Sequence, residues 1–174
     1  MAGSAAKTIV ELPQLSLKHG EGRRLELPLP GDSLSLGGQD YRAVEDTPAR
    51  LEVSRTARGY ALRLSFQAAV RGPCVRCLGP AALDVDVEAR EVEEPEVADE
   101  ELRSPYVEEG HLDLGRWAHD SLVLALPQKL LCRPDCAGLC PVCGESLNDA
   151  DPAQHAHQAE RDSRWAKLDE LRLE

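Results

Sequence analysis

Hydrophobic and polar residues alternate along two neighbouring segments in the middle of the chain. In the first segment an apolar side chain stands at every second position from Tyr60 to Val70, with polar or small residues between. In the second, apolar positions from Leu83 to Ala89 alternate with charged ones. A period of two is typical of a β-strand with one face buried. The pattern therefore predicts two half-buried strands.

These two strands are close enough in sequence to form one antiparallel hairpin. The register that places both apolar faces on the same side pairs Val70 with Leu83, Ala68 with Val85 and Phe66 with Val87. A slip of one residue would turn one apolar face away from the other. The connection runs from Gly72 to Ala81 and contains Cys74 and Cys77, so this cysteine pair is expected at the hairpin tip.

A helical pattern follows over residues 112–126, where apolar positions recur three and four residues apart from Leu114 through Trp117 to Ala125. Asp113 is the expected N-cap and Pro127 the expected stop. Trp117 is predicted to anchor the core. A shorter helix is expected over residues 162–173, with apolar residues three apart.

The remaining segments give the organisation of the chain. Strands are expected at Ile9–Leu17, Arg23–Leu29 and Asp40–Val44, separated by proline and glycine. A strongly acidic stretch with two prolines favours a solvated linker. We therefore divide the chain into an antiparallel β region at residues 1–92, an acidic linker at 93–111, and a helical, cysteine-rich region at 112–174.

Composition narrows the class of protein. The 174 residues carry a formal net charge of -11, and aromatic residues make up 3%. These values argue against a protein that coats phosphates generally, and against one that stacks bases on many aromatic side chains. No apolar run reaches the roughly 18 residues of a membrane span, and the first residues do not resemble a secretory signal. A cytoplasmic location without membrane attachment is expected.

Six cysteines fall into two groups, Cys74 with Cys77, and a cluster of four that lies within twelve residues. In a reducing compartment such grouping favours metal or redox chemistry over disulfides. Four thiols so close in sequence can close around one structural Zn²⁺, and short loops cost little entropy to close. The expected ligands are Cys132, Cys136, Cys140 and Cys143.

Other ligand sets remain open at this point. His155 or His157 can replace one cysteine and give a site of three cysteines and one histidine. Cys74 and Cys77 can instead combine with Cys140 and Cys143, because two C-x2-C turns from distant segments form the usual zinc ribbon. The sequence does not choose among these sets.

Signals of catalysis are missing from the sequence. It contains no H-E-x-x-H motif, no glycine-rich phosphate loop and no G-x-S-x-G. The C-x2-C pair at the hairpin tip is capable of dithiol chemistry, but a thioredoxin-like pair stands at a helix N-terminus after a strand. We therefore expect a protein that is not an enzyme and has no small-molecule substrate.

Four segments in this order resemble one known family. They are C-V-R-C-L at 74–78, HLDLGRWAHDSLVLALP at 111–127, LCRPDCAGLCPVCGESLN at 131–148 and DSRWAKLDEL at 162–171. Together they are similar to the YceD family, the large ribosomal RNA subunit accumulation proteins. The resemblance covers Ala61 to Leu171.

The resemblance implies a bacterial or plastid protein that is needed for synthesis, processing or stability of 23S rRNA and has no recognised catalytic activity. By position, Cys74 and Cys77 match the family's C-x-R-C pair, and the four later cysteines match the cluster of its metal-type members. His155-Ala156-His157 stands where some members have C-x-C. This replacement keeps donors that can bind a metal.

The expected protein therefore has an α+β fold, with an antiparallel sheet, packing helices and a zinc-stapled loop near the C-terminus. Its expected function is the non-enzymatic support of 23S rRNA and large-subunit assembly, with a pre-50S particle as partner. Either 23S rRNA or a basic ribosomal protein is the direct contact. The candidate contact residues are Arg63, Arg71 and Arg76, which otherwise form a solvated face paired with acidic residues. The alternatives are a rubredoxin-like or dithiol redox protein, and a zinc-ribbon adaptor unrelated to ribosomes.

Overall fold

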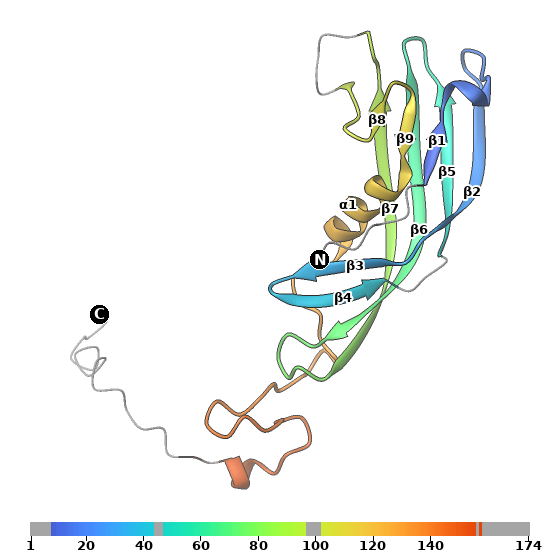
Figure 1. The fold of residues 1–174 in the computed structure, drawn as a ribbon. Coiled ribbons are helices and arrows are strands. Elements are labelled where there is room, and N and C mark those ends of the chain that lie inside the picture. Colours follow the sequence, from blue (N-terminus) through green and yellow to red (C-terminus); the bar gives the residue numbers. More distant parts are fainter. Residues whose placement is uncertain (1–7, 44–46, 97–101, 156, 158–174) are drawn as a thin grey trace, which may run out of the picture.

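A long β-hairpin forms the backbone of the molecule (Figure 1). It consists of β6 (Tyr60–Pro73) and β7 (Pro80–Glu93). The structure is a computed structural model that describes residues 8–43, 47–96, 102–155 and 157. Within it the predicted register is confirmed, because Phe66 pairs with Val87, Ala68 with Val85 and Val70 with Leu83.

Burial along the hairpin follows the predicted alternation. Leu62, Leu64, Ala68 and Val70 are buried, whereas Arg63, Gln67 and Arg71 between them are exposed. The apolar face is covered by the rest of the fold, and burial of such side chains contributes about 1.5–3 kcal/mol each. The hairpin is therefore held mainly by its one buried face.

Two further pairs of antiparallel strands extend the sheet from the other edge of β6. The first half of β6 pairs with β5, which pairs with β2, and the second half pairs with β4, which pairs with β3. All pairings are antiparallel. Their bounds are β2 (Gly22–Leu29), β3 (Asp32–Leu36), β4 (Gln39–Ala43) and β5 (Thr47–Arg55). In Figure 1 the β3–β4 hairpin crosses the lower half of the sheet.

A small second sheet joins the start of the chain to its middle. It contains β1 (Ile9–Glu11), β9 (His111–Asp113) and β8 (Val107–Glu108), in that order. β1 belongs to the region predicted as residues 1–92, and β8 to the stretch predicted as a linker. The described part of that stretch packs on the core, since Ser104 is buried and the Tyr106 ring stacks on Trp117 with centroids 6.2 Å apart.

One α-helix, α1 (Leu114–Ala125), is present among the described residues and lies against β7. The Asp113 side chain caps it by accepting a hydrogen bond from the Arg116 backbone N–H, at 3.0 Å. Trp117 is 1% exposed, which confirms its predicted place in the core. The helix expected over 162–173 lies outside the described residues. No helix in the described part is long and apolar enough to cross a membrane.

The strands of the first fifty residues differ from those expected. The strand predicted at Ile9–Leu17 ends at Glu11, because Pro13 has no N–H to donate and begins the short 3-10 helix η1 (Pro13–Leu15). The strands at 32–36 and 47–55 were not predicted. Over the residues that the structure describes, the fold is thus mostly antiparallel sheet with one α-helix, in keeping with the expected α+β class.

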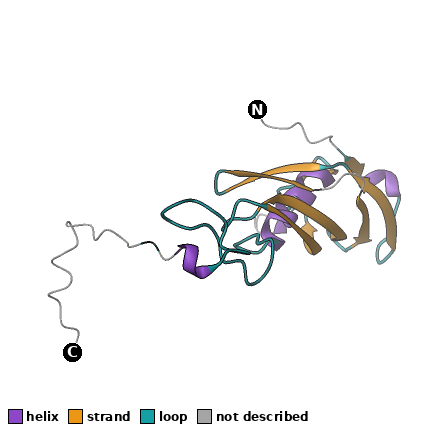
Figure 2. Ribbon diagram, turned by 90° about the horizontal axis from the view of Figure 1, so that it is seen from below, coloured by secondary structure: helices purple, strands orange, loops and turns teal. Residues whose placement is uncertain are grey.

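The buried residues form two clusters along the length of the sheet. The upper one in Figure 1 gathers around Trp117, Leu12 and Leu64, between α1, β1 and the β2–β5–β6 half. The lower one gathers around Tyr41, Val70 and Leu122, and it includes Cys74 and Cys136. Seen from below, the cysteine-rich loops project from this lower end (Figure 2). Two of the cysteines are therefore part of the core.

Candidate metal centres

The tip of the β6–β7 hairpin forms a tight cysteine turn. The last strand pair is Pro73 with Pro80, and the loop closes through hydrogen bonds from Leu78 N to Cys74 O, at 2.9 Å, and from Cys74 N to Gly79 O, at 2.7 Å. Cys74 is fully buried, whereas Cys77 is half-buried. The long strand ladder thereby fixes where both thiols lie.

The chain that follows α1 runs back beside this turn. The Val75 backbone N–H donates to the Leu130 carbonyl at 3.0 Å, and the Leu130 side chain is buried. Two residues later comes Cys132. A turn closed by a hydrogen bond from Cys136 N to Arg133 O, at 3.1 Å, then directs Cys136 back toward the hairpin.

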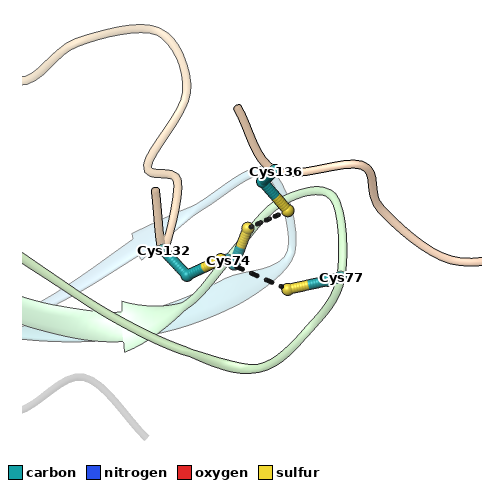
Figure 3. Close-up of side chains that lie close together, drawn as sticks. All are labelled: Cys74, Cys77, Cys132 and Cys136. Carbon is teal, nitrogen blue, oxygen red and sulfur yellow. Dashed lines mark hydrogen bonds between the residues drawn. The ribbon is translucent and has the colours of Figure 1, made fainter. Parts of the chain in front are cut away.

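Cys74, Cys77, Cys132 and Cys136 form the first centre, in which the four sulfur atoms all lie within 4.8 Å of one another. Figure 3 shows the sulfurs of the hairpin turn facing those of the later segment. The Cys74 and Cys136 sulfurs are 3.7 Å apart, and those of Cys77 and Cys132 are 3.6 Å apart. Sulfurs at tetrahedral corners about 2.3 Å from a common zinc ion are roughly 3.8 Å apart. The donor set therefore fits a four-sulfur metal site.

The pKa shifts of the thiols in the first centre are also consistent with a metal site. Burial raises the pKa of the Cys74 thiol, but backbone hydrogen bonds from Cys77, Arg76 and Cys132 outweigh it and lower this pKa to about 6. Desolvation, followed by hydrogen bonds with the thiols of Cys77, Cys136 and Cys74, raises the pKa of Cys132 to about 12. A divalent cation bound by these sulfurs would favour the thiolate form of Cys132 as well as that of Cys74.

The expected contiguous grouping of Cys132, Cys136, Cys140 and Cys143 is not the arrangement in the structure, which divides these cysteines between two groups. The entropic cost of closing a loop rises only slowly with its length. A site closed by short loops therefore has only a small entropic advantage over one closed by long loops. The sheet already holds the hairpin tip beside Leu130, and that contact selects the partners of Cys132 and Cys136. Nor does the structure join Cys74 and Cys77 to Cys140 and Cys143.

The second group consists of Cys140, Cys143, His155 and His157, whose donor atoms also lie within 4.8 Å of one another. His155 ends the 3-10 helix η3 (Pro152–His155). The sequence marked all four donors but not their combination. It also gave no signal for Leu130, which positions Cys132, or for Glu145, whose carboxylate lies 3.8 Å from the His155 ring.

The three candidate contact arginines have different surroundings. Arg63 forms an ion pair with Glu88 at 3.2 Å, which is the solvated, paired face considered above. Arg71 lies opposite Arg42 across β4 and β6, and both are exposed. Arg76 is exposed in the cysteine turn, and neither it nor Arg71 has an ion-pair partner in the described part of the chain. The two arginines at the cysteine end are thus free to bind an anion.

Comparisons with known proteins identify the family of this chain. The sequence model of a family described as "Large ribosomal RNA subunit accumulation protein YceD" matches residues 62–172, a range that includes every cysteine and both histidines of the two groups. No solved structure matches the chain.

Mycobacterial proteins are similar over most of the chain. Relatives named as uncharacterized proteins in Mycobacterium tuberculosis and Mycobacterium bovis are 35% identical over 144 residues, which is 79% of this chain and 67% of each relative. One in Mycobacterium leprae is 34% identical over 104 residues, 56% of this chain and 46% of the relative. On the match to the family, this chain belongs to the YceD family, the large ribosomal RNA subunit accumulation proteins.

Proposed function

We propose that this chain is a cytoplasmic, non-enzymatic factor that supports 23S rRNA accumulation and assembly of the large ribosomal subunit. The observation that carries the proposal is the family match across residues 62–172, since the family's description names large-subunit rRNA accumulation. The partner is then a pre-50S particle. No step of covalent chemistry is assigned to the chain.

In this proposal the first centre holds a structural Zn²⁺. Its ligands are Cys74, Cys77, Cys132 and Cys136, and when bound the ion supplies cross-linking and charge compensation. Four protein donors leave no open position for a substrate, and structural zinc sites are typically of this closed kind. The cross-link would join the β6–β7 hairpin to the segment after α1, from Cys77 to Cys132 across 55 residues of sequence.

The contact with the particle is assigned to the arginines at the cysteine end. Arg71 and Arg42 are like charges directly opposite each other, an arrangement that is unfavourable unless an anion or solvent separates them. They line an open hollow of about 790 Å³ between β4 and the adjoining ends of β6 and β7, which also includes Asp40. Guanidinium groups bind phosphates through paired N–H donors, so an RNA backbone suits this surface.

The function is tested by depletion of the protein from its host. The expected result is a fall in 23S rRNA and an accumulation of incomplete 50S particles, with 16S rRNA and 30S subunits unchanged. An equal fall in both subunits, or no change in either, would refute the assembly role.

The contact surface is tested separately with Arg71→Glu/Arg76→Glu. This variant is expected to stay folded and to lose co-sedimentation with pre-50S particles. The control is Arg23→Glu/Arg58→Glu, which makes the same change in charge at exposed positions in β2 and in the β5–β6 connection, near the opposite end of β6. If the first variant still co-sediments, the arginine contact is wrong, and acidic surface that docks a basic ribosomal protein becomes the better account.

A further inference from the structure

The second group of donors lies on the part of the chain that follows the first centre, and none of its members belongs to that centre. We propose that Cys140, Cys143, His155 and His157 form a second zinc-type metal centre, so that each chain binds two ions through different donor sets. This goes beyond the proposed function and does not depend on it. Three features of the local structure support it.

The two cysteines sit on a turn whose backbone is built around their sulfurs. Gly144 N donates to Cys140 O at 2.9 Å, Cys140 N donates to Glu145 O at 2.8 Å, and Leu139 forms a β-bridge with Ser146. Gly144 has a φ of +76°, a conformation that glycine adopts without steric cost.

His155 is oriented as metal-binding histidines are. Its side chain is only 9% exposed, although Cys143 beside it is exposed. Its Nδ1 lies 3.4 Å from the Cys143 sulfur, close to the roughly 3.5 Å that separates a sulfur and a nitrogen on one tetrahedral zinc. Its Nε2 lies 3.8 Å from a Glu145 carboxylate oxygen. The carboxylate therefore lies beside the ring nitrogen that does not face the sulfur, which is where metal-binding histidines usually meet a carboxylate.

His157 completes the donor set. Its ring meets that of His155 edge-on, with centroids 5.8 Å apart and planes at 73°. All four donor atoms therefore converge, two from the cysteine turn and two from the end of η3. Two thiolates and two imidazoles make a full zinc set, so this centre is also closed.

The two centres differ in how they relate to the fold. The first joins Cys74 to Cys136, which are 62 residues apart and both buried. The second is formed within residues 140–157, outside both core clusters. Loss of the second ion is therefore expected to leave the sheet and the first centre intact.

The test is the metal content of protein purified under reducing conditions, measured by elemental mass spectrometry against protein concentration. The wild-type chain is expected to hold two zinc ions. His155→Ala/His157→Ala is expected to hold one and to keep the melting temperature of the sheet. The control His19→Ala/His111→Ala removes two exposed histidines elsewhere and should keep both ions.

Substitution with Co²⁺ identifies the donors of the second ion. The visible spectrum of the wild type minus that of His155→Ala/His157→Ala is expected to be that of tetrahedral cobalt with two sulfur and two nitrogen ligands. One ion in the wild type, two ions retained in His155→Ala/His157→Ala, or a difference spectrum of sulfur ligands only would each overturn the proposal. None of these results bears on the rRNA role, which depletion tests separately.

Discussion

At the scale of single residues, the thiols of the first centre have opposite electrostatic environments. The pKa of Cys74 is lowered to about 6, although burial alone raises it, because backbone hydrogen bonds stabilise its thiolate. The pKa of Cys132 is raised to about 12 by desolvation and by neighbouring thiols. A cation bound by all four sulfurs would stabilise the thiolate of Cys132 as well as that of Cys74.

Cys136→Ser is expected to remove the ion of the first centre, since the Cys136 sulfur lies 3.7 Å from that of Cys74. Structural zinc sites contribute about 10–16 kcal/mol of binding free energy in small peptides, so we expect a loss of at least about 3 kcal/mol in unfolding free energy. Chemical denaturation with and without chelator measures this.

Chelator should destabilise the wild type strongly. Cys143→Ser, which affects only the second group, should stay close to wild type. Equal stability of Cys136→Ser and wild type would contradict a structural role.

Asp113→Ala is expected to lower the unfolding free energy by about 1 kcal/mol, because the carboxylate caps α1 through the Arg116 N–H. Asp113→Asn keeps an acceptor at the same place and should be nearly neutral. Thermal denaturation of both variants checks this. A cost as large in the Asn variant as in the Ala variant would show that the cap is not the cause.

Ionisation of the Tyr106 hydroxyl makes the unfolding free energy depend on pH in the alkaline range. Burial, then the hydrogen bond to Asp120 and its charge, raise the pKa of Tyr106 above its usual 10. The unfolded chain therefore ionises first, so this contribution to stability is present below about pH 10 and is lost as pH rises through the folded pKa. Tyr106→Phe should cost about 1 kcal/mol near neutral pH, through loss of the 3.1 Å hydrogen bond to Asp120.

The measurement is the unfolding free energy across the alkaline range. The gap between wild type and Tyr106→Phe should narrow above about pH 10, and Asp120→Asn should show a weaker pH dependence than wild type. A gap that widens with pH would contradict the assigned pKa shift.

At the scale of elements, the β4 hairpin packs onto β6 where β6 lacks a side chain. A Cβ at Gly72 would lie 2.2 Å from Cδ1 of the Tyr41 ring, so only glycine admits this contact. Tyr41 is 3% exposed and belongs to the lower core cluster, which also contains Cys74. Gly72 thus allows the β3–β4 hairpin to cover the sheet beside the first metal centre.

Gly72→Ala is expected to destabilise the protein by about 1–3 kcal/mol through overpacking against Tyr41. Combination with Tyr41→Leu should recover part of that cost, because the shorter side chain leaves room for the added methyl group. Denaturation of the two single variants and the double variant gives the coupling. Strictly additive costs would show that the Tyr41 contact is not what requires glycine.

The elements that the sequence predicted correctly are those with long, regular patterns. The β6–β7 register follows from fourteen consecutive strand pairs with one apolar face, and the α1 boundaries follow from Asp113 and Pro127. β3 was missed because it has only five residues. β5 does alternate, with Ala49, Leu51 and Val53 buried, but three apolar positions make a weaker pattern than those of β6 and β7.

At the scale of the whole molecule, the donors of the metal centres could be predicted but their combination could not. All six cysteines and both histidines stood out by type and spacing. Their grouping depends on long-range contacts such as that of Val75 N with Leu130 O, which no local pattern encodes. The close approach of Gly138, whose added Cβ would lie 3.3 Å from the Arg76 carbonyl oxygen, likewise brings the second cysteine loop against the first turn.

The architecture separates two tasks along the molecule. The sheet and α1 form the body, and the cysteine loops project from its lower end (Figures 1 and 2). Arg71 lies near the end of β6 that leads into the cysteine turn, and Arg76 lies in that turn. A zinc ion in the first centre, where the β6–β7 turn meets the segment after α1, would hold those loops in place for contact with the assembling subunit. Such an ion would have to be held by Cys74, Cys77, Cys132 and Cys136 alone.

X-ray absorption at the zinc edge of the His155→Ala/His157→Ala variant tests that claim most directly, since only the first centre remains loaded. The expected spectrum shows a single shell of four sulfur neighbours at about 2.3 Å, with no nitrogen or oxygen. A shell with fewer sulfurs, or with a light atom from solvent or substrate, would contradict a closed four-cysteine centre.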